Sequence, residues 1–278
     1  MAFELAQVTA HGADEAVALY EKHGFVCIAL NVADNDNFQT IAHNLKLKMS
    51  GQYRSGDHNR GAHRVCTNSP QNIFDDDYYE LLEFIMQPGK MLFHVMLRIE
   101  DTLQLDTCGG DYVGPWAPAS RATYWHQDWD ACHHVVAVSV IIEEITLDMA
   151  PLVMATESTQ VPIVGPAGLI VVRDVAVWHR GSINRTDFGR PLPCFRFSTA
   201  MGRTASPDLA RPRIRNRHQF MFYPHLQHFI NTIIRPPTDT EVLDEIANDD
   251  RPGITILVNP VDDADSVRFW VSQFRNTF

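Results

Sequence analysis

Between residues 102 and 200 the chain alternates short apolar runs with turn-forming residues, and this pattern limits the possible folds more than any other feature. The runs that read as strands are residues 103–107, 122–128, 134–145, 151–156, 168–173, 176–179 and 194–200. Short runs of this kind, bounded by Gly, Pro, Asn or Asp, are typical of antiparallel strands. We therefore expect a mainly β protein with flanking helices, folded as a double-stranded β-helix of the jelly-roll or cupin-like kind.

The first hundred residues have a different pattern. Apolar residues at helical spacing predict helices over residues 14–23, 38–49, 77–86 and 90–100, with a strand at 25–30 and a polar loop at 51–70. A length of 278 residues fits one large sheet-rich domain. We expect a single domain over residues 1–278, with a helical part at 1–100, a core at about 100–202 and an extension at 203–278. Within the extension, residues 223–234, 241–247 and 266–274 are candidate helices.

Composition narrows the classes of partner. The formal net charge is −11 at pH 7, which repels phosphate backbones, so we expect no nucleic acid partner. No apolar run approaches the roughly 20 residues that span a bilayer, so we expect no membrane partner. The five cysteines include no C-x-x-C pair, which indicates reduced thiols in a cytoplasmic protein. The assembly state stays open, with a homodimer as one candidate.

The most informative short motif is the H-x-D triplet formed by His126 and Asp128. In an extended strand, residues i and i+2 point to the same side, so these two side chains would face one point. A third candidate, His179, follows 179 − 126 = 53 residues later. Two histidines and a carboxylate suit non-haem Fe(II) and leave coordination positions open. An H-x-D triplet alone more often has a structural or surface role than a metal-binding one. Together with His179, Arg190 and the residues from Trp178 to Asn184, a metal-binding role is favoured.

Arg190 is the candidate partner for a bound acid. It follows His179 by 190 − 179 = 11 residues, across a turn. Two open positions on the metal could accept an α-keto acid, whose far carboxylate then needs a cation. An arginine suits that role because its planar fork grips a carboxylate and keeps its charge. Arg185, Arg196 and Arg203 compete by residue type, and the spacing favours Arg190.

Several segments together resemble a known family. They are His126-Gln127-Asp128, Pro151-Leu152-Val153-Met154, Val172-Arg173-Asp174, Trp178-His179-Arg180-Gly181 with Asn184 and Thr186, and Arg190-Pro191. With these segments, residues 14–202 resemble the phytanoyl-CoA dioxygenase-like family of Fe(II)/2-oxoglutarate-dependent oxygenases. Two departures are Met149-Ala150, where the family usually has a glycine, and Tyr124, where it often has a polar residue. Neither departure removes a metal ligand.

The resemblance implies a chemistry. It makes His126, Asp128 and His179 the iron ligands and Arg190 the anchor of 2-oxoglutarate. The cofactor set is then Fe(II) with 2-oxoglutarate and O₂ as co-substrates. The products from the keto acid are succinate and CO₂. Hydroxylation of an unactivated C–H bond is the default outcome, with desaturation, ring closure and endoperoxide formation as variants. The aromatic residues around the motif favour a small, hydrophobic metabolite of secondary metabolism as the substrate, with small polar substrates as the open alternative.

Further residues are weaker candidates for the same site. Gln104 and Thr107 could donate hydrogen bonds to 2-oxoglutarate, or lie on a solvated strand face. Tyr124 shares the ligands' face of the expected strand and could contact 2-oxoglutarate or substrate. Asn184 is at least as compatible with a turn as with a substrate contact, because Asn readily bonds its own backbone.

Aromatic and basic residues near the motif could contact substrate. Trp116 and Trp129 could form part of an aromatic wall, against the alternative of core packing. Arg60 lies in the polar loop at residues 54–64, which could be a lid or a solvated loop.

Two rival functions fit the same fold. One is a non-catalytic cupin-like module that binds a metal or ligand. The other is a metal-dependent isomerase or hydrolase that uses Zn(II), in which Arg190 would have no evident role.

Overall fold

The computed structural model describes a defined part of the chain. The described residues are 5–56, 63–68, 72, 75–100, 102–117, 125–128, 135–156, 159–199, 213–214, 226, 229, 232–233, 256–260 and 267–271. The chain groups into two compact units, Met1–Ala210 and Arg211–Phe278. The expected single domain stays a prediction. None of the helices in the described part is long and apolar enough to cross a membrane.

A large mixed sheet forms the centre of the first unit. In spatial order its strands are β1 (Thr9–Ala10), β2 (Phe25–Ala29), β8 (Leu169–Asp174), β5 (Val135–Val140), β10 (Arg190–Ser198), β4 (Gln104–Val113) and β3 (Arg64–Cys66). Only β1 and β2 pair in parallel, and every other neighbouring pair is antiparallel. From β2 to β4 each pair of neighbouring strands is distant in sequence, which is the connectivity expected of a jelly roll, whereas the outer pairs β1–β2 and β3–β4 are consecutive.

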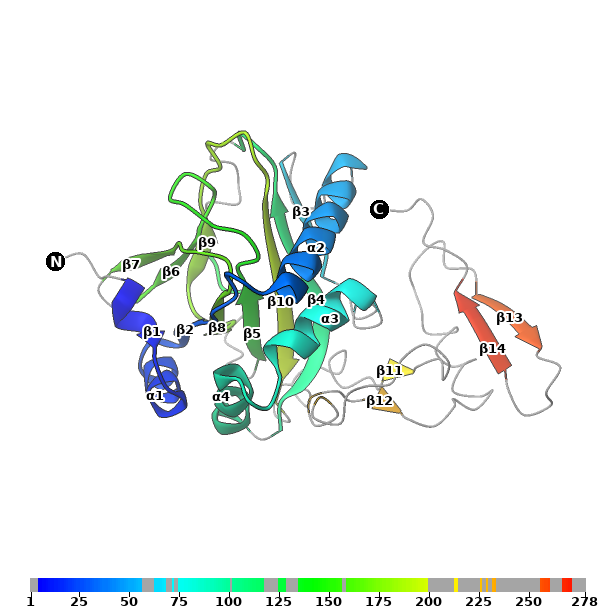
Figure 1. Cartoon of the computed structure of the whole chain (residues 1–278), viewed down its shortest axis with the longest axis horizontal. Coiled ribbons are helices and arrows are strands. Elements are labelled where there is room, and N and C mark those ends of the chain that lie inside the picture. The colour runs from blue at the N-terminus through cyan, green and yellow to red at the C-terminus, as the bar shows by residue number, and fades with distance from the viewer. Residues whose placement is uncertain are drawn as a thin grey trace. The chain divides into compact units, whose positions relative to one another are not determined.

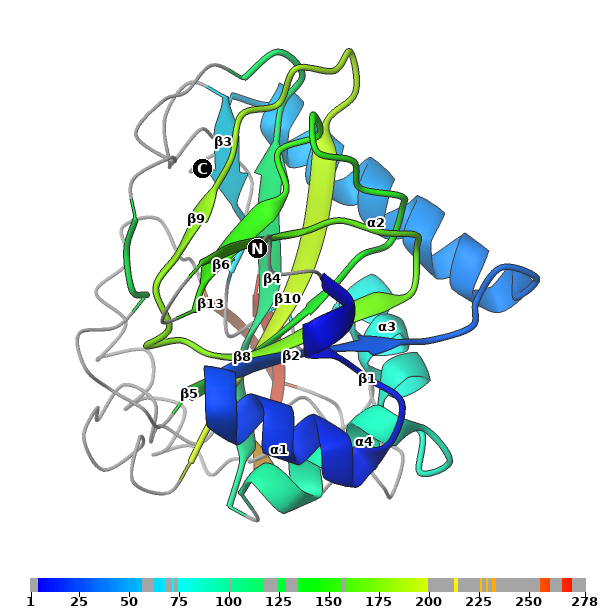
Figure 2. The same cartoon turned by 90° about the vertical axis from the view of Figure 1, so that its left-hand side faces the viewer.

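A smaller antiparallel sheet faces the large one. Its order is β7 (Gln160–Ile163), β6 (Leu152–Ala155) and β9 (His179–Gly181). Figures 1 and 2 show this small sheet on one side of the large sheet and helices α2 and α3 on the other. The fold is therefore mainly β with flanking helices and two facing sheets, as expected.

The four predicted helices are confirmed, with shifted ends. They are α1 (Ala13–His23), α2 (Asp36–Arg54), α3 (Asp76–Ile85) and α4 (Met91–Ile99), after a short 3₁₀ turn η1 (Leu5–Val8). Gly24 ends α1 at φ 73°, where its N–H donates to the Tyr20 carbonyl. Residues 51–70 were expected to be one polar loop. The last residues of α2 and the edge strand β3 occupy part of this range, so the loop is shorter than predicted.

The space between the two sheets has an apolar half and a polar half. The apolar half is a buried cluster contributed by both sheets: Phe25, Cys27, Ile141, Met154, Val161, Ile163, Leu169, Val171 and Leu192. On the large sheet, Arg64 of β3 and Arg190 of β10 both lie opposite Val113 of β4. Directly paired residues share a sheet face, so both guanidinium groups point to the same side. Charged side chains therefore gather at one end of the interior.

The expected strand at residues 122–128 is wrong for its described part. Residues 125–128 are irregular, and only His126 is paired, in an isolated bridge with His179. His179 begins β9, whereas a strand ending at this residue was expected. The two ligand segments bond each other through two backbone hydrogen bonds, His126 N to His179 O and the reverse, both 3.0 Å.

In the extension, the helix expected at residues 223–234 has Leu226 and Phe229 in 3₁₀ conformation but Thr232 and Ile233 in a strand, and the described residues of the helix expected at 266–274 form a strand. The helix expected at residues 241–247 lies outside the described residues. β12 (Thr232–Ile233) pairs in parallel with β11 (Arg213–Ile214), and β14 (Val267–Val271) pairs with β13 (Ile256–Pro260). Short apolar runs fit either period, and the β-branched and aromatic residues of β14 favour a strand.

Candidate metal centre

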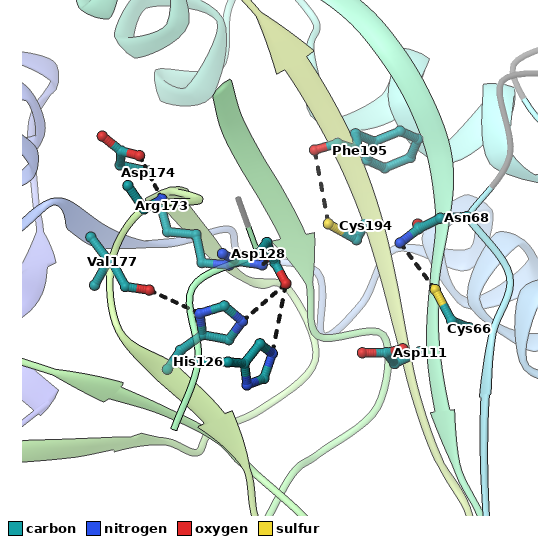
Figure 3. Close-up of polar contacts among 12 residues, drawn as sticks. Cys66, Asn68, Asp111, His126, Asp128, Arg173, Asp174, Val177, Cys194 and Phe195 are labelled. Atoms are coloured by element: carbon teal, nitrogen blue, oxygen red, sulfur yellow. Dashed lines mark hydrogen bonds and ion pairs between the residues drawn. The ribbon is translucent and has the colours of Figure 1, made fainter. Parts of the chain in front are cut away.

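Three predicted ligands lie together at the mouth between the sheets. Among the described residues, His126, Asp128 and His179 form the group that could hold a metal ion, with one ligand atom of each within 4.8 Å of the others. Asp128 Oδ1 lies 3.4 Å from His179 Nε2 and 3.7 Å from His126 Nε2. Figure 3 shows both imidazole rings converging on this carboxylate. Two neutral imidazoles and one carboxylate are the donor set that suits non-haem Fe(II).

The ring of His179 is oriented by the backbone. Its Nδ1 lies 2.9 Å from the Val177 carbonyl oxygen, so Nδ1–H donates there and Nε2 keeps its lone pair for a metal. Burial, together with the nearby positive charge of Arg173, lowers the pKa of His179 below its ordinary value, and Asp128 opposes this only in part. The imidazole is therefore neutral near pH 7, which is the form that binds metal.

Asp128 is held by a residue that the motif did not include. Arg173 of β8 donates from Nη2 to Asp128 Oδ2, and its side chain is only 8% exposed. Burial alone would raise the pKa of Asp128. The charge of Arg173 and the hydrogen bond with His179 outweigh burial and hold that pKa well below its usual range. The carboxylate is thus ionised and has one oxygen, Oδ1, facing the histidines.

Arg190 begins β10 and is almost completely buried, at 1% exposure. Its Nε donates to the Ala150 carbonyl oxygen at 3.1 Å. Its Nη1 is buried and has no hydrogen-bond partner among the described residues. Burial and the charge of Arg64 lower the pKa of Arg190 to about 10. A buried cation with a free donor is a ready site for an anion, because an uncompensated charge away from water is unfavourable.

Arg64 and Asp111 complete this charged end of the interior. Arg64 of the edge strand β3 forms an ion pair with Asp111 of β4. Asp111 points from β4 toward the side of the interior where His126 and Asp128 lie (Figure 3). With Arg190, this group has two positive charges and one negative charge, which leaves a net attraction for a carboxylate.

The structure does not place Gln104 beside Arg190. Gln104 pairs with Ser198, whereas Arg190 pairs with Val113 at the other end of β4. These positions are nine residues apart on β4, or about 30 Å of strand. Thr107, opposite Arg196, is six residues from Val113, and its buried Oγ1 has no partner in the described part. Thr107 is therefore not on a solvated face.

Trp116 lies at the surface. It is 62% exposed and donates from Nε1 to Asp187 Oδ1 at 2.6 Å. Tyr124, Trp129 and Arg60 lie outside the described residues, so their proposed contacts stay predictions.

Asn184 takes the turn role that the sequence left open. It is 1% exposed, and its amide donates to the carbonyl oxygens of Gly114 and Phe188. Its Oδ1 accepts from the backbone N–H and the hydroxyl of Thr186. Every polar atom of the side chain is bonded to protein. The amide therefore shapes the loop that leads into β10 and Arg190.

Comparison with known proteins supports the fold. No family model matches the chain, and no curated protein matches it. Among solved structures, EctD from S. alaskensis with bound Fe has a TM-score of 0.51 at 14% identity, over 69% of this chain and 79% of that one. The same protein with 2-oxoglutarate and 5-hydroxyectoine has a TM-score of 0.50 at 14% identity, covering 73% and 84%.

A third structure belongs to the same group. The non-haem α-ketoglutarate-dependent carbocyclase SnoK from nogalamycin biosynthesis has a TM-score of 0.50 at 14% identity, over 72% of this chain and 87% of that one. This chain therefore has the jelly-roll fold of non-haem iron and 2-oxoglutarate-dependent oxygenases. At this identity the likeness concerns the fold.

The residues present fit the implied cofactors. The three ligand atoms offer two imidazole nitrogens and one carboxylate oxygen at one point. The buried guanidinium of Arg190 has a donor that no described side chain uses. Arg173 and Arg64 were missed as contributors. Arg173 stood inside a quoted motif, but nothing local in the sequence shows that it points at Asp128, 45 residues away.

Proposed function

We propose that this protein is a non-haem Fe(II)- and 2-oxoglutarate-dependent oxygenase. The observation that carries the proposal is that His126, Asp128 and His179 converge while Arg190, in the same interior, keeps a buried unused donor. A metal triad alone fits many functions. A triad together with a buried guanidinium that lacks an anion fits a metal enzyme whose co-substrate carries a second carboxylate.

The chain's own residues would each have a defined task. His126, Asp128 and His179 would hold the iron, which supplies the activation of O₂ coupled to decarboxylation of the keto acid. Arg190 would bind the far carboxylate of 2-oxoglutarate and so orient its keto-acid end toward the ligands. The Val177 carbonyl keeps the proton of His179 on Nδ1. Burial of Arg190 and Arg173 keeps water away from these charged groups, which strengthens their interactions.

The reaction and substrate belong to the same proposal. We infer hydroxylation of an unactivated C–H bond in a small, hydrophobic metabolite, with release of succinate and CO₂, in a cytoplasmic protein of the phytanoyl-CoA dioxygenase-like kind. This inference rests on the motif between Trp178 and Arg190 and on the fold. Trp116 does not support it, because that ring is exposed.

A binding experiment tests the core of the proposal. Purified protein with Fe(II) and 2-oxoglutarate under anaerobic conditions should develop the visible charge-transfer absorbance of an iron–keto acid chelate. His126→Ala should abolish this absorbance because a ligand is lost. His43→Ala is a matched control, since His43 is an exposed residue of α2. Persistence of the full signal in His126→Ala would contradict the assignment.

The rival functions predict different results. A non-catalytic module would bind metal and ligand but release no succinate on exposure to O₂ with a broad substrate panel. A zinc-dependent isomerase or hydrolase would contain zinc after anaerobic purification, and Arg190→Met would leave its metal-dependent activity unchanged.

A further inference from the structure

Arg173 is a buried charge, 7% exposed, that the three-ligand motif does not explain. It lies within β8, where the register sets it opposite Phe25 of β2 and Ala137 of β5. Its backbone is thus fixed on both sides by the large sheet. Its side chain reaches Asp128 Oδ2 through Nη2, while Nε and Nη1 are buried without a hydrogen-bond partner among the described residues.

Asp128, by contrast, lies in an irregular stretch. Its backbone N–H donates to the Val175 carbonyl oxygen at 3.1 Å, and the residue belongs to no strand. The two carboxylate oxygens have different surroundings: Oδ1 faces the imidazole nitrogens of His126 and His179, and Oδ2 faces Arg173. The orientation of this carboxylate is therefore set by a residue of the rigid sheet.

We propose that Arg173 is a positioning residue that makes Asp128 a ligand through Oδ1 alone and so keeps coordination positions open at the metal. The inference rests on the proposed function. A carboxylate can bind a metal through one oxygen or through both. An ion pair with Oδ2 keeps that oxygen away from the metal. Arginine suits this task because it cannot lose its charge and presents its donors in a rigid fork.

The number of open positions matters for the proposed chemistry. Six coordination positions minus two histidine nitrogens and one carboxylate oxygen leaves three. With iron bound, the keto acid would need two of them and O₂ would need one. If Asp128 bound through both oxygens, only two positions would remain, and the keto acid and O₂ would compete. Arg173 therefore affects the number of coordination positions open to co-substrates, and it does not itself determine whether the metal binds.

The test compares Arg173→Met with wild type in two binding measurements. Mn(II) affinity is measured first without co-substrate, by electron paramagnetic resonance of the free ion. Affinity of the Mn(II)-loaded protein for 2-oxoglutarate is measured next, by calorimetry. We expect Mn(II) affinity to be retained or increased, and 2-oxoglutarate affinity to fall by about 10- to 100-fold, the usual range for residues that orient metal ligands. Arg173→Lys, which keeps a donor for Oδ2, should restore part of the loss.

A surface arginine supplies the matched control. Arg185→Met also removes an arginine from an ion pair, with the exposed Asp148, and should change neither affinity. Two results would overturn the inference: unchanged 2-oxoglutarate affinity in Arg173→Met, or joint loss of Mn(II) and 2-oxoglutarate binding in a folded variant. Joint loss would mean that Arg173 merely supports the fold of the site.

A measurement on wild type covers the case in which Arg173→Met does not fold. In a crystal structure of the Mn(II)-bound protein, Asp128 should bind the metal through Oδ1, with Oδ2 on Arg173. Binding through both oxygens would overturn the inference while leaving the proposed function in place. Failure of wild type to bind any metal would instead overturn the proposed function and this inference together.

Discussion

Two buried arginines face the same interior from the same sheet, and their surroundings differ. Arg173 on β8 donates to Asp128 Oδ2, and although burial alone would lower its pKa, the charge of Asp128 raises it. Among the described residues, the hydrogen-bond partner of Arg190 at the start of β10 is the neutral carbonyl oxygen of Ala150, bonded through Nε, and burial beside Arg64 lowers the pKa of Arg190 to about 10.

The difference separates structure from function. The protein supplies the anion for Arg173 itself, so this charge is compensated whenever the chain is folded. Within the described part Arg190 has no ion-pair partner, and Asp111, whose negative charge acts on it, is paired with Arg64, so much of the cost of burying the Arg190 charge persists until a ligand binds. Local costs of this kind are expected at functional sites. Substitutions at each arginine site and at its partners test this difference.

The largest effect should come from removing the partner of Arg173. Asp128→Ala leaves a buried cation without its anion, which costs about 3–5 kcal/mol of unfolding free energy. Urea unfolding of the metal-free protein measures this value. Asp148→Ala removes an exposed partner of Arg185 and should cost at most about 1 kcal/mol. Equal losses in the two variants would show that the buried pair is not special.

Arg190→Met should behave in the opposite way. It removes a buried charge that has no ion-pair partner among the described residues, which offsets the lost bond to Ala150, so the unfolding free energy of the metal-free protein should change by no more than about 1 kcal/mol. The same variant should lose the stabilisation by 2-oxoglutarate, which in metal-loaded wild type is about 2.7 kcal/mol at a hundred times the dissociation constant. A thermal shift by 2-oxoglutarate that survives in Arg190→Met would contradict the anchor role.

A smaller effect is expected in the pH dependence of the unfolding free energy, through His179, whose pKa Arg173 lowers. The pKa of His179 is lowered in the folded state by burial and by Arg173. The unfolded chain therefore takes up a proton first, near the ordinary histidine pKa of about 6.5. Stability from this group is present above that pH and is lost as the pH falls toward the folded pKa, by up to about 1.4 kcal/mol per unit.

His179→Gln isolates this contribution in the metal-free protein. The difference in unfolding free energy between wild type and the variant should shrink as the pH is lowered from about 7 to 5.5. A difference that stays constant over this interval would mean that His179 does not titrate with a lowered pKa.

The smallest effect concerns the residue that holds Arg190. Ala150 has φ 49°, in the left-handed region that favours glycine. Ala150→Gly should relieve this cost and, after the greater freedom of glycine in the unfolded chain, stabilise the protein by about 0.5 kcal/mol. A small rise in the melting temperature, with unchanged 2-oxoglutarate affinity, is the expected result. A lower affinity for 2-oxoglutarate would show that the methyl group of Ala150 helps to orient the side chain of Arg190.

The sequence predicted the convergence of the three candidate ligands better than it predicted their surroundings. His126, Asp128 and His179 could be found because the spacing within the triplet and the context of the second histidine are local patterns. The helices were found for the same reason, since their periodicity and the glycine at residue 24 are local. Placement of the triplet on a regular strand was wrong, because its pairing depends on a partner 53 residues away.

Arg173 could not be found from local pattern. Its role depends on the register of β8 against β2 and β5, and on where an irregular segment brings Asp128. Trp116 was placed near the site only by nearness in sequence; its ring is exposed at the surface, and its contact with substrate stays a prediction. Burial and direction of a side chain follow from tertiary packing, which residue type and spacing do not specify.

The strand that carries Arg190 and the segment that carries His126 are held by different numbers of backbone hydrogen bonds, and amide hydrogen exchange should differ between them. β10 is paired along its length with β4 and, from Cys194 to Ser198, also with β5, so its amides should open only with the whole sheet. His126 is tied to β9 by one bridge, so local opening there should cost much less free energy. Exchange would then be slow along the strand that carries Arg190 and fast at the segment that carries His126. The anchor would keep its shape while the ligand segment opens and closes around it.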